Sequence, residues 1–147
     1  MSDEPLTNAA VEFIRRGHAA MNAAESPATG EMSESVSSDF VYDSRNRFGV
    51  DFGPSDWPEF LGSIWHVSEG RPKFSEPQAI AVRGQRCAVI TARIDYGDDA
   101  FTEYLHCIVL DPTLQRLQRI VSFDSDRPDD RDAAIAELDR LHAEIDD

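Results

Sequence analysis

Apolar residues are spaced differently in the two parts of this chain. From residue 5 to about residue 67 they recur mostly at steps of three and four, which is typical of helices buried along one side. From Lys73 onward they alternate with polar residues, which is typical of strands with one buried face. A short strand, Phe40–Asp43, interrupts the helical part, and a helical stripe returns at the C-terminus. The pattern therefore predicts helices first, then a sheet, then a last helix.

Each helical segment has an apolar stripe and a residue suited to starting a helix. The segments are expected over residues 5–24, about 26–36, from Gly53 or Ser55 through Trp65, and about 129–145. The third segment carries the strongest stripe, formed by Trp57, Phe60, Leu61, Ile64 and Trp65.

Four longer strands follow one another at the end of the sheet-forming part. They are expected over residues 73–83, 86–96, 100–110 and 114–123. The connections Arg-Gly-Gln, Gly-Asp-Asp and Asp-Pro-Thr are short turns, so consecutive strands should pair antiparallel. Helices packed on an antiparallel sheet form an α+β fold, and 147 residues suit a single domain over 1–147.

Composition and charge exclude several classes of partner. The formal net charge of −14 repels phosphate backbones and anionic membranes, so we expect no binding to nucleic acid or to a membrane. The chain has no apolar run long enough for a membrane span, and its first residues do not have the pattern of a signal peptide. A cytoplasmic protein is expected, with Cys87 and Cys107 as buried thiols.

Strand register predicts which polar groups meet. If the turn at Gly97–Asp99 places Tyr96 opposite Ala100, Arg93 lies opposite Glu103. The same reasoning through the next turn places Val121 opposite Glu103. One face of the sheet then carries Arg93, Asp95, Glu103 and Arg119 among Val89, Leu105, Leu117 and Val121, and the other carries Ile90, Ile94, Tyr104, His106, Ile108 and Ile120. If helices cover the first face, the second is too apolar to stay bare, which predicts a homodimer.

The order of elements, with Arg119–Asp124 leading into the last helix, resembles the nuclear transport factor 2-like superfamily. This group includes ketosteroid isomerase, polyketide cyclases and limonene epoxide hydrolase. The resemblance covers nearly the whole chain. It implies a cystatin-like cone, in which a curved antiparallel sheet packs on three to four α-helices around a pocket for a small, largely apolar molecule. It also implies dimers formed through the outer face of the sheet.

The segment Arg93-x-Asp95, preceded by Thr91, resembles the Arg-x-Asp of limonene epoxide hydrolase. In that family the Arg bridges two carboxylates, one acting as acid on the epoxide and one as base on a water. Asp95 matches the acid in position. Val121 stands where the second carboxylate is expected, and Glu103 on the adjacent strand is the alternative source. The competing interpretation is a cross-strand ion pair on a half-exposed sheet.

Asp43 resembles, in its place after the first strand, the general base of ketosteroid isomerase. Burial at the mouth of an apolar cone would raise the pKa of such a carboxyl and suit it to proton transfer. The alternative is a turn, or a salt bridge to Arg45 or Arg47. The Tyr and protonated Asp of the isomerase have no counterpart in register, so steroid isomerisation is not expected.

The expected ligand-binding residues combine the helical aromatic stripe with the polar-lined face of the sheet. They are Tyr42, Trp57, Phe60, Trp65, Thr91, Leu105 and Val121. His106 is typical of a hydrogen-bonded core or interface histidine, and no spacing indicates a metal or cofactor. Three hypotheses remain open: a cone that binds a small apolar or amphipathic molecule, a cofactor-free hydrolase, lyase or isomerase, and a dimerisation module whose cone is filled by side chains.

Overall fold

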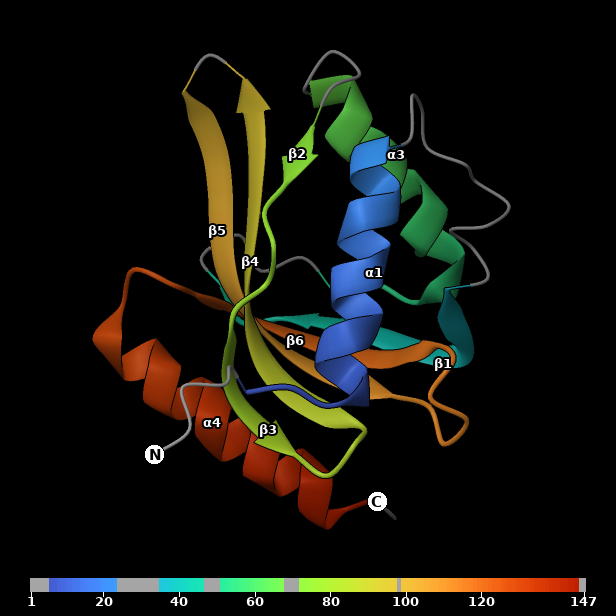
Figure 1. Ribbon diagram of the computed structural model, residues 1–147, viewed down its shortest axis with the longest axis vertical. Coiled ribbons are helices and arrows are strands. Elements are labelled where there is room, and N and C mark those ends of the chain that lie inside the picture. Colours follow the sequence, from blue (N-terminus) through green and yellow to red (C-terminus); the bar gives the residue numbers. More distant parts are fainter. Residues whose placement is uncertain (1–5, 24–34, 47–50, 68–71, 98, 146–147) are drawn as a thin grey trace.

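The computed structural model of the protein describes residues 6–23, 35–46, 51–67, 72–97 and 99–145. In the described residues, helices interrupted by one strand come first, a run of strands follows and a helix comes last, as the spacing of apolar residues predicts (Figure 1). In chain order they are α1 (Ala9–Ala23), β1 (Val36–Ser44), the short 3-10 helix η1 (Pro54–Asp56), α3 (Trp57–Val67), β2 (Lys73–Phe74), β3 (Ala79–Arg83), β4 (Cys87–Gly97), β5 (Ala100–Leu110), β6 (Leu117–Asp124) and α4 (Pro128–Ala143).

The strands form one six-stranded sheet in the order β1-β6-β5-β4-β2, and β3 also pairs with β4. The expected α+β class is confirmed. The sheet is mixed rather than wholly antiparallel, because β1 lies parallel to β6 at the edge of the antiparallel meander. β1 begins at Val36, which was expected to end a second helix. Ser35 lies in a turn, and the remaining residues of that expected helix, 26–34, lie outside the described residues. The expected strand 73–83 is divided into β2 and β3 by a segment that contains Pro77.

The register between β4 and β5 is the one predicted, with Arg93 opposite Glu103. The register between β5 and β6 differs, because Val121 lies opposite Cys107 and not opposite Glu103. The reason is a longer connection than the sequence indicates. The Asp111 carboxylate accepts hydrogen bonds from the backbone N–H groups of Gln115 and Arg116, at 3.0 and 3.1 Å, and β6 starts only at Leu117.

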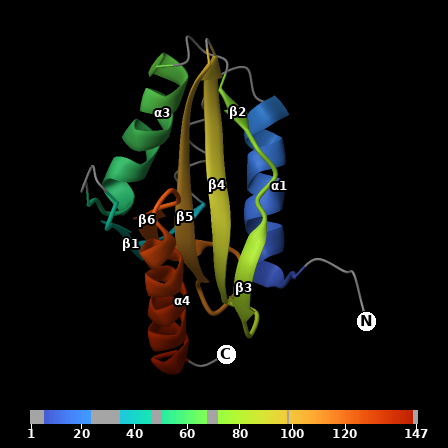
Figure 2. The same ribbon diagram turned by 90° about the vertical axis from the view of Figure 1, so that its left-hand side faces the viewer.

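Helices cover both faces of the sheet. α1 and α3 lie over one face, called here the pocket face, and α4 lies against the other, called the outer face (Figures 1 and 2). Two separate hydrophobic cores result. One joins α1 and α3 to Ile90, Ile108 and Ile120, and the other joins Leu138 of α4 to Val121 and neighbouring outer-face residues.

The expected assignment of the two faces is therefore wrong. The isoleucine-rich face, expected to be bare and to form a dimer, is the pocket face beneath α1 and α3. The face that carries Arg93 and Glu103 is the outer face, and α4 covers the part of it around Leu105 and Val121. The large apolar stripes of α1 and α3 pack on the more apolar face, since this removes more apolar surface from water.

Two further observations concern the sequence predictions. None of the helices in the described part of the chain is long and apolar enough to cross a membrane. Cys87 and Cys107 are buried thiols that are not joined in a disulfide. Burial raises the pKa of the Cys107 thiol to about 12, so this sulfur stays protonated and unreactive.

Candidate functional site

A cavity of about 950 Å³ lies between the pocket face of the sheet and the helices α1 and α3. Its volume is near the upper end of the range of about 300–1,000 Å³ that is common for small-molecule sites. Most of its lining is apolar or aromatic. Alternation along the strands explains how the sheet contributes, because every second residue of β4 and β5 points to the same face. The contributing residues on these strands are Ile90, Ala92, Ile94, Tyr96, Thr102, Tyr104, His106 and Ile108.

One wall of the pocket is a cluster of aromatic rings from β1, α3 and the segment between them. The rings of Tyr42 and Phe52 stack nearly parallel with centroids 4.5 Å apart, and Phe60 lies 4.9 Å from Phe52. The Trp57 ring stacks on Phe60 at 5.7 Å, and its indole N–H donates to the Ser35 hydroxyl at 3.0 Å. Rings held in this way form a rigid, flat and apolar surface.

Several polar groups at the pocket are already bonded within the protein. Tyr42 forms a side-chain hydrogen bond with Ser122, whose hydroxyl also accepts one from the Asn46 amide at 2.9 Å. Burial raises the pKa of Tyr42 to about 12, so its hydroxyl is neutral at ordinary pH. The hydroxyls of Tyr96 and Thr102 are hydrogen-bonded to each other at 3.0 Å.

Two histidines from opposite elements also line the pocket. His18 of α1 donates from Nδ1 to the Ser75 carbonyl at 3.0 Å, since a carbonyl only accepts. Burial lowers the pKa of His18. His106 of β5 lies parallel to the Tyr104 ring at 6.2 Å and edge-on to Tyr42 at 6.0 Å. Burial lowers the pKa of His106 to about 3, so both imidazoles are neutral near pH 7.

The Nε2 atom of His106 is buried and has no hydrogen-bond partner among the described residues. Most buried polar atoms in proteins have such a partner, because an unpaired one loses its water without compensation. The described lining of the pocket also contains no Asp or Glu, although the chain has 28 acidic residues. The one charged residue in this described lining is Arg16, and its side chain is exposed. The site is thus suited to binding through shape, apolar contact and neutral hydrogen bonds.

Three of the seven expected ligand-binding residues, Tyr42, Trp57 and Phe60, line this pocket. The other four lie elsewhere. Leu105 and Val121 pack beneath α4 on the outer face, and Trp65 is buried in the core beside Phe74 at 5.9 Å. Thr91 accepts a hydrogen bond from the backbone N–H of Gln78 at 3.0 Å.

The expected catalytic group of Arg93, Asp95 and Glu103 is brought together, but on the outer face. Arg93 donates to Asp95 at 3.2 Å and to Glu103 at 3.5 Å. Its guanidinium also covers the Phe101 ring, 4.0 Å from the centroid. The expectation that these groups face the cavity is wrong, because side chains of alternating residues point to opposite sides of the sheet. The observed arrangement is the cross-strand ion pair that the sequence offered as the alternative.

Asp43, the other expected catalytic residue, also lies away from the described lining of the pocket. Its carboxylate accepts a hydrogen bond from Arg45 at 3.0 Å, and the same guanidinium reaches Glu137 of α4 at 3.1 Å. The salt bridge to Arg45, which the sequence offered as the alternative, is therefore confirmed. Its effect is to tie the end of β1 to α4.

Sequence reasoning missed several polar residues of the pocket. They are His18, Asn46, Tyr96, Thr102, Tyr104 and His106. Strand alternation did group Tyr104 with His106 on one face of the sheet. The error was to expect helices on the opposite face. The signal that could have found them is the aromatic stripe of α3, which needs an apolar sheet face to pack against.

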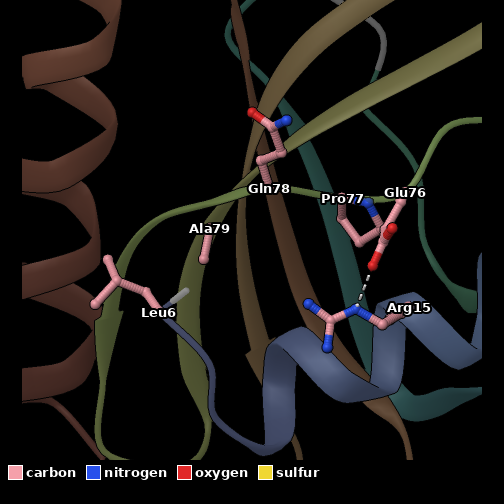
Figure 3. Close-up of a pocket in the computed structure, with 6 residues that line it drawn as sticks. All are labelled: Leu6, Arg15, Glu76, Pro77, Gln78 and Ala79. Atoms are coloured by element: carbon pink, nitrogen blue, oxygen red, sulfur yellow. Dashed lines mark ion pairs between the residues drawn. The ribbon is translucent and has the colours of Figure 1, made fainter. Parts of the chain in front are cut away.

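A second, smaller hollow of about 350 Å³ lies between the N-terminal part of α1 and the segment before β3 (Figure 3). The side chains of Arg15 and Glu76 point toward one another there, and their Nε and Oε1 atoms are 3.1 Å apart. These two side chains therefore form an ion pair, and Arg15 forms a second one with Glu12. The remaining lining residues are Leu6, Pro77, Gln78 and Ala79, which bring no convergent chemistry.

The chain matches no family model and no curated protein sequence. Its fold is similar to that of several solved structures. A protein of unknown function with a cystatin-like fold from Methylobium petroleophilum is 15% identical, with a TM-score of 0.61, and the match covers 84% of this chain and 81% of that one. AusH from Aspergillus nidulans is 10% identical, with a TM-score of 0.63 and coverage of 84% and 89%.

A candidate polyketide cyclase from Pseudomonas putida is 12% identical, with a TM-score of 0.57 and coverage of 82% of this chain and 94% of that one. At such identities the likeness shows the fold alone. The chain has a cystatin-like α+β fold, shared with proteins of more than one description.

Proposed function

We propose that this protein binds a small, largely apolar molecule in the pocket between the sheet, α1 and α3. The observation that carries the proposal is the cavity of about 950 Å³ with its aromatic wall. A dimerisation module whose cone is filled by side chains would leave no such space. The fold is also similar to that of a candidate polyketide cyclase, which agrees with a cone that receives small molecules.

The alternative of a cofactor-free hydrolase, lyase or isomerase that uses Arg93, Asp95 and Glu103 has less support. These groups lie across the sheet from the pocket, and each side chain is between 37% and 39% exposed. Their charges are therefore screened by water and cannot act on a molecule held beneath α1 and α3. A binding function needs none of them.

A pair of glycines offers a direct test. Gly17 of α1 lines the pocket, and a Cβ added there meets no atom within 4 Å. The substitution Gly17→Phe should place a ring in the cavity and weaken binding of the neutral dye phenylnaphthylamine by about tenfold, because much of the contact area is lost. Dye emission, which rises in apolar surroundings, measures the affinity.

Gly62 of α3 is the matched control. An added Cβ also meets no atom within 4 Å there, and Gly62 is absent from the lining of the pocket. Both substitutions remove a helical glycine and should stabilise their helices similarly. Gly62→Phe should therefore leave dye affinity unchanged. Failure of the native protein to bind the dye, or equal losses in both variants, would overturn the proposed function.

A further inference from the structure

His106 differs from the other polar groups around the pocket in its hydrogen bonding. Tyr96 is bonded to Thr102, Tyr42 to Ser122, and His18 to the backbone. The buried Nε2 of His106 has no partner among the described residues. The half-buried ring borders the cavity, so a ligand that enters the cavity can supply a partner.

The electrostatics of the lining indicate which kind of partner this is. The described lining offers no carboxylate to a cationic ligand, and Arg16 lies exposed, where water screens its charge. A charged group carried into the apolar part of the pocket would lose its hydration without a counter-charge. The polar group that reaches His106 should therefore be neutral.

The shape of the walls indicates the rest of the molecule. Tyr42 and Phe52 stack within 9° of parallel, and Trp57 lies within 25° of the Phe60 plane. Flat walls of this kind fit a flat ligand, because planar rings stack with little loss of conformational entropy. A hydroxyl group both donates and accepts, so it can pair with either nitrogen of a neutral imidazole.

From these observations we infer that the ligand is an uncharged aromatic molecule with a hydroxyl group that hydrogen-bonds to His106. The inference rests on the proposed function and specifies the chemical class of ligand for the same pocket. His106 is then the residue that orients the ligand, and the aromatic wall supplies most of the contact area.

Three probes of nearly equal size test the inference: naphthalene, naphthol and naphthoate, each displacing phenylnaphthylamine at pH 7. We expect naphthol to bind about tenfold more tightly than naphthalene, as one neutral hydrogen bond in a dry site allows. Naphthoate should bind no more tightly than naphthalene, because its charge has no buried partner.

Variants then assign the effect to His106. His106→Phe should reduce the affinity for naphthol to that for naphthalene and leave naphthalene binding unchanged. Thr91→Val is the matched control, since it removes a polar side chain of β4 that is absent from the described lining of the pocket and accepts a hydrogen bond from Gln78 instead. It should leave the ratio of the two affinities at its native value. If His106→Phe does not fold, His106→Leu replaces it, because leucine also lacks a hydrogen-bonding group. The comparison of naphthol with naphthalene in the native protein does not depend on either variant.

The possible results distinguish a failure of the proposed function from a failure of the inference about His106. If the dye and all three probes fail to bind, the proposed function itself is overturned. If the dye and naphthalene bind but naphthol gains nothing, only the inference about His106 is overturned. Naphthoate binding most tightly, or Thr91→Val abolishing the naphthol preference, would overturn it as well.

Discussion

At the scale of single residues, two ion-pair groups on the outer face differ in their burial. Glu137 of α4 is 7% exposed and accepts hydrogen bonds from Arg45 and Arg140. The Arg93 group is more than a third exposed at every member. Similar partners in different surroundings should contribute differently to stability, because water competes with exposed pairs and weakens them.

Glu137→Ala should lower the free energy of unfolding by about 2 kcal/mol, whereas Arg93→Ala should lower it by about 0.5 kcal/mol or less. The Arg140 hydrogen bond, with Arg45, holds the pKa of Glu137 below its usual value. The contribution of Glu137 is therefore complete above its unfolded-state pKa and is lost as the pH falls through the lower folded-state pKa. Urea unfolding of both variants at pH 7 and in acid measures this difference. Equal losses at pH 7 would contradict it.

At the scale of elements, the spacing of apolar residues predicted most helices and strands but not the side of the sheet on which each helix packs. In β4, Ala88 and Val89 are both fully buried, one on each face. A strand with two apolar faces shows alternation but does not identify which helix covers which face. The predicted site was wrong for the same reason. Assigning the wrong face to the pocket placed Arg93 inside it and His106 outside it. The register of β6 was missed because the length of its loop depends on hydrogen bonds of Asp111.

Because the two cores share only the sheet, α4 should stabilise the protein without shaping the pocket. Leu138→Ala removes a fully buried side chain from α4 and should lower the free energy of unfolding by about 3 kcal/mol. At a temperature where this variant is folded, its dye affinity should equal that of the native protein. Leu61→Ala is the comparison, since Leu61 is buried on α3 and lines the pocket. It should reduce stability and also alter dye affinity, and a change of affinity in Leu138→Ala would refute the separation.

At the scale of the whole molecule, the homodimer stays a prediction. The face that first indicated it packs beneath α1 and α3, so any dimer must use another surface. We propose that a dimer forms through the outer face instead. There the Phe101 ring is 51% exposed beside Arg93, beyond the part that α4 covers.

Light scattering at micromolar concentration should therefore give twice the mass of the chain, and Phe101→Ser should return it to the mass of one chain. Leu6→Ser is the control, because Leu6 is 49% exposed but lies before α1. A native protein that scatters as a single chain would end the prediction. So would a dimer that Phe101→Ser leaves intact.

The alternation of β4 and β5 divides their sequence into two sets of positions that can vary separately. Even-numbered residues such as Ala92, Tyr104 and His106 meet the cavity, and odd-numbered residues such as Val89 and Cys107 hold α4. Mutations at even positions can change what is bound while the packing of α4 stays as it was. A library of variants restricted to those positions would sample new ligand preferences in a constant scaffold. Natural mutations at the same positions could change ligand preference in the same way.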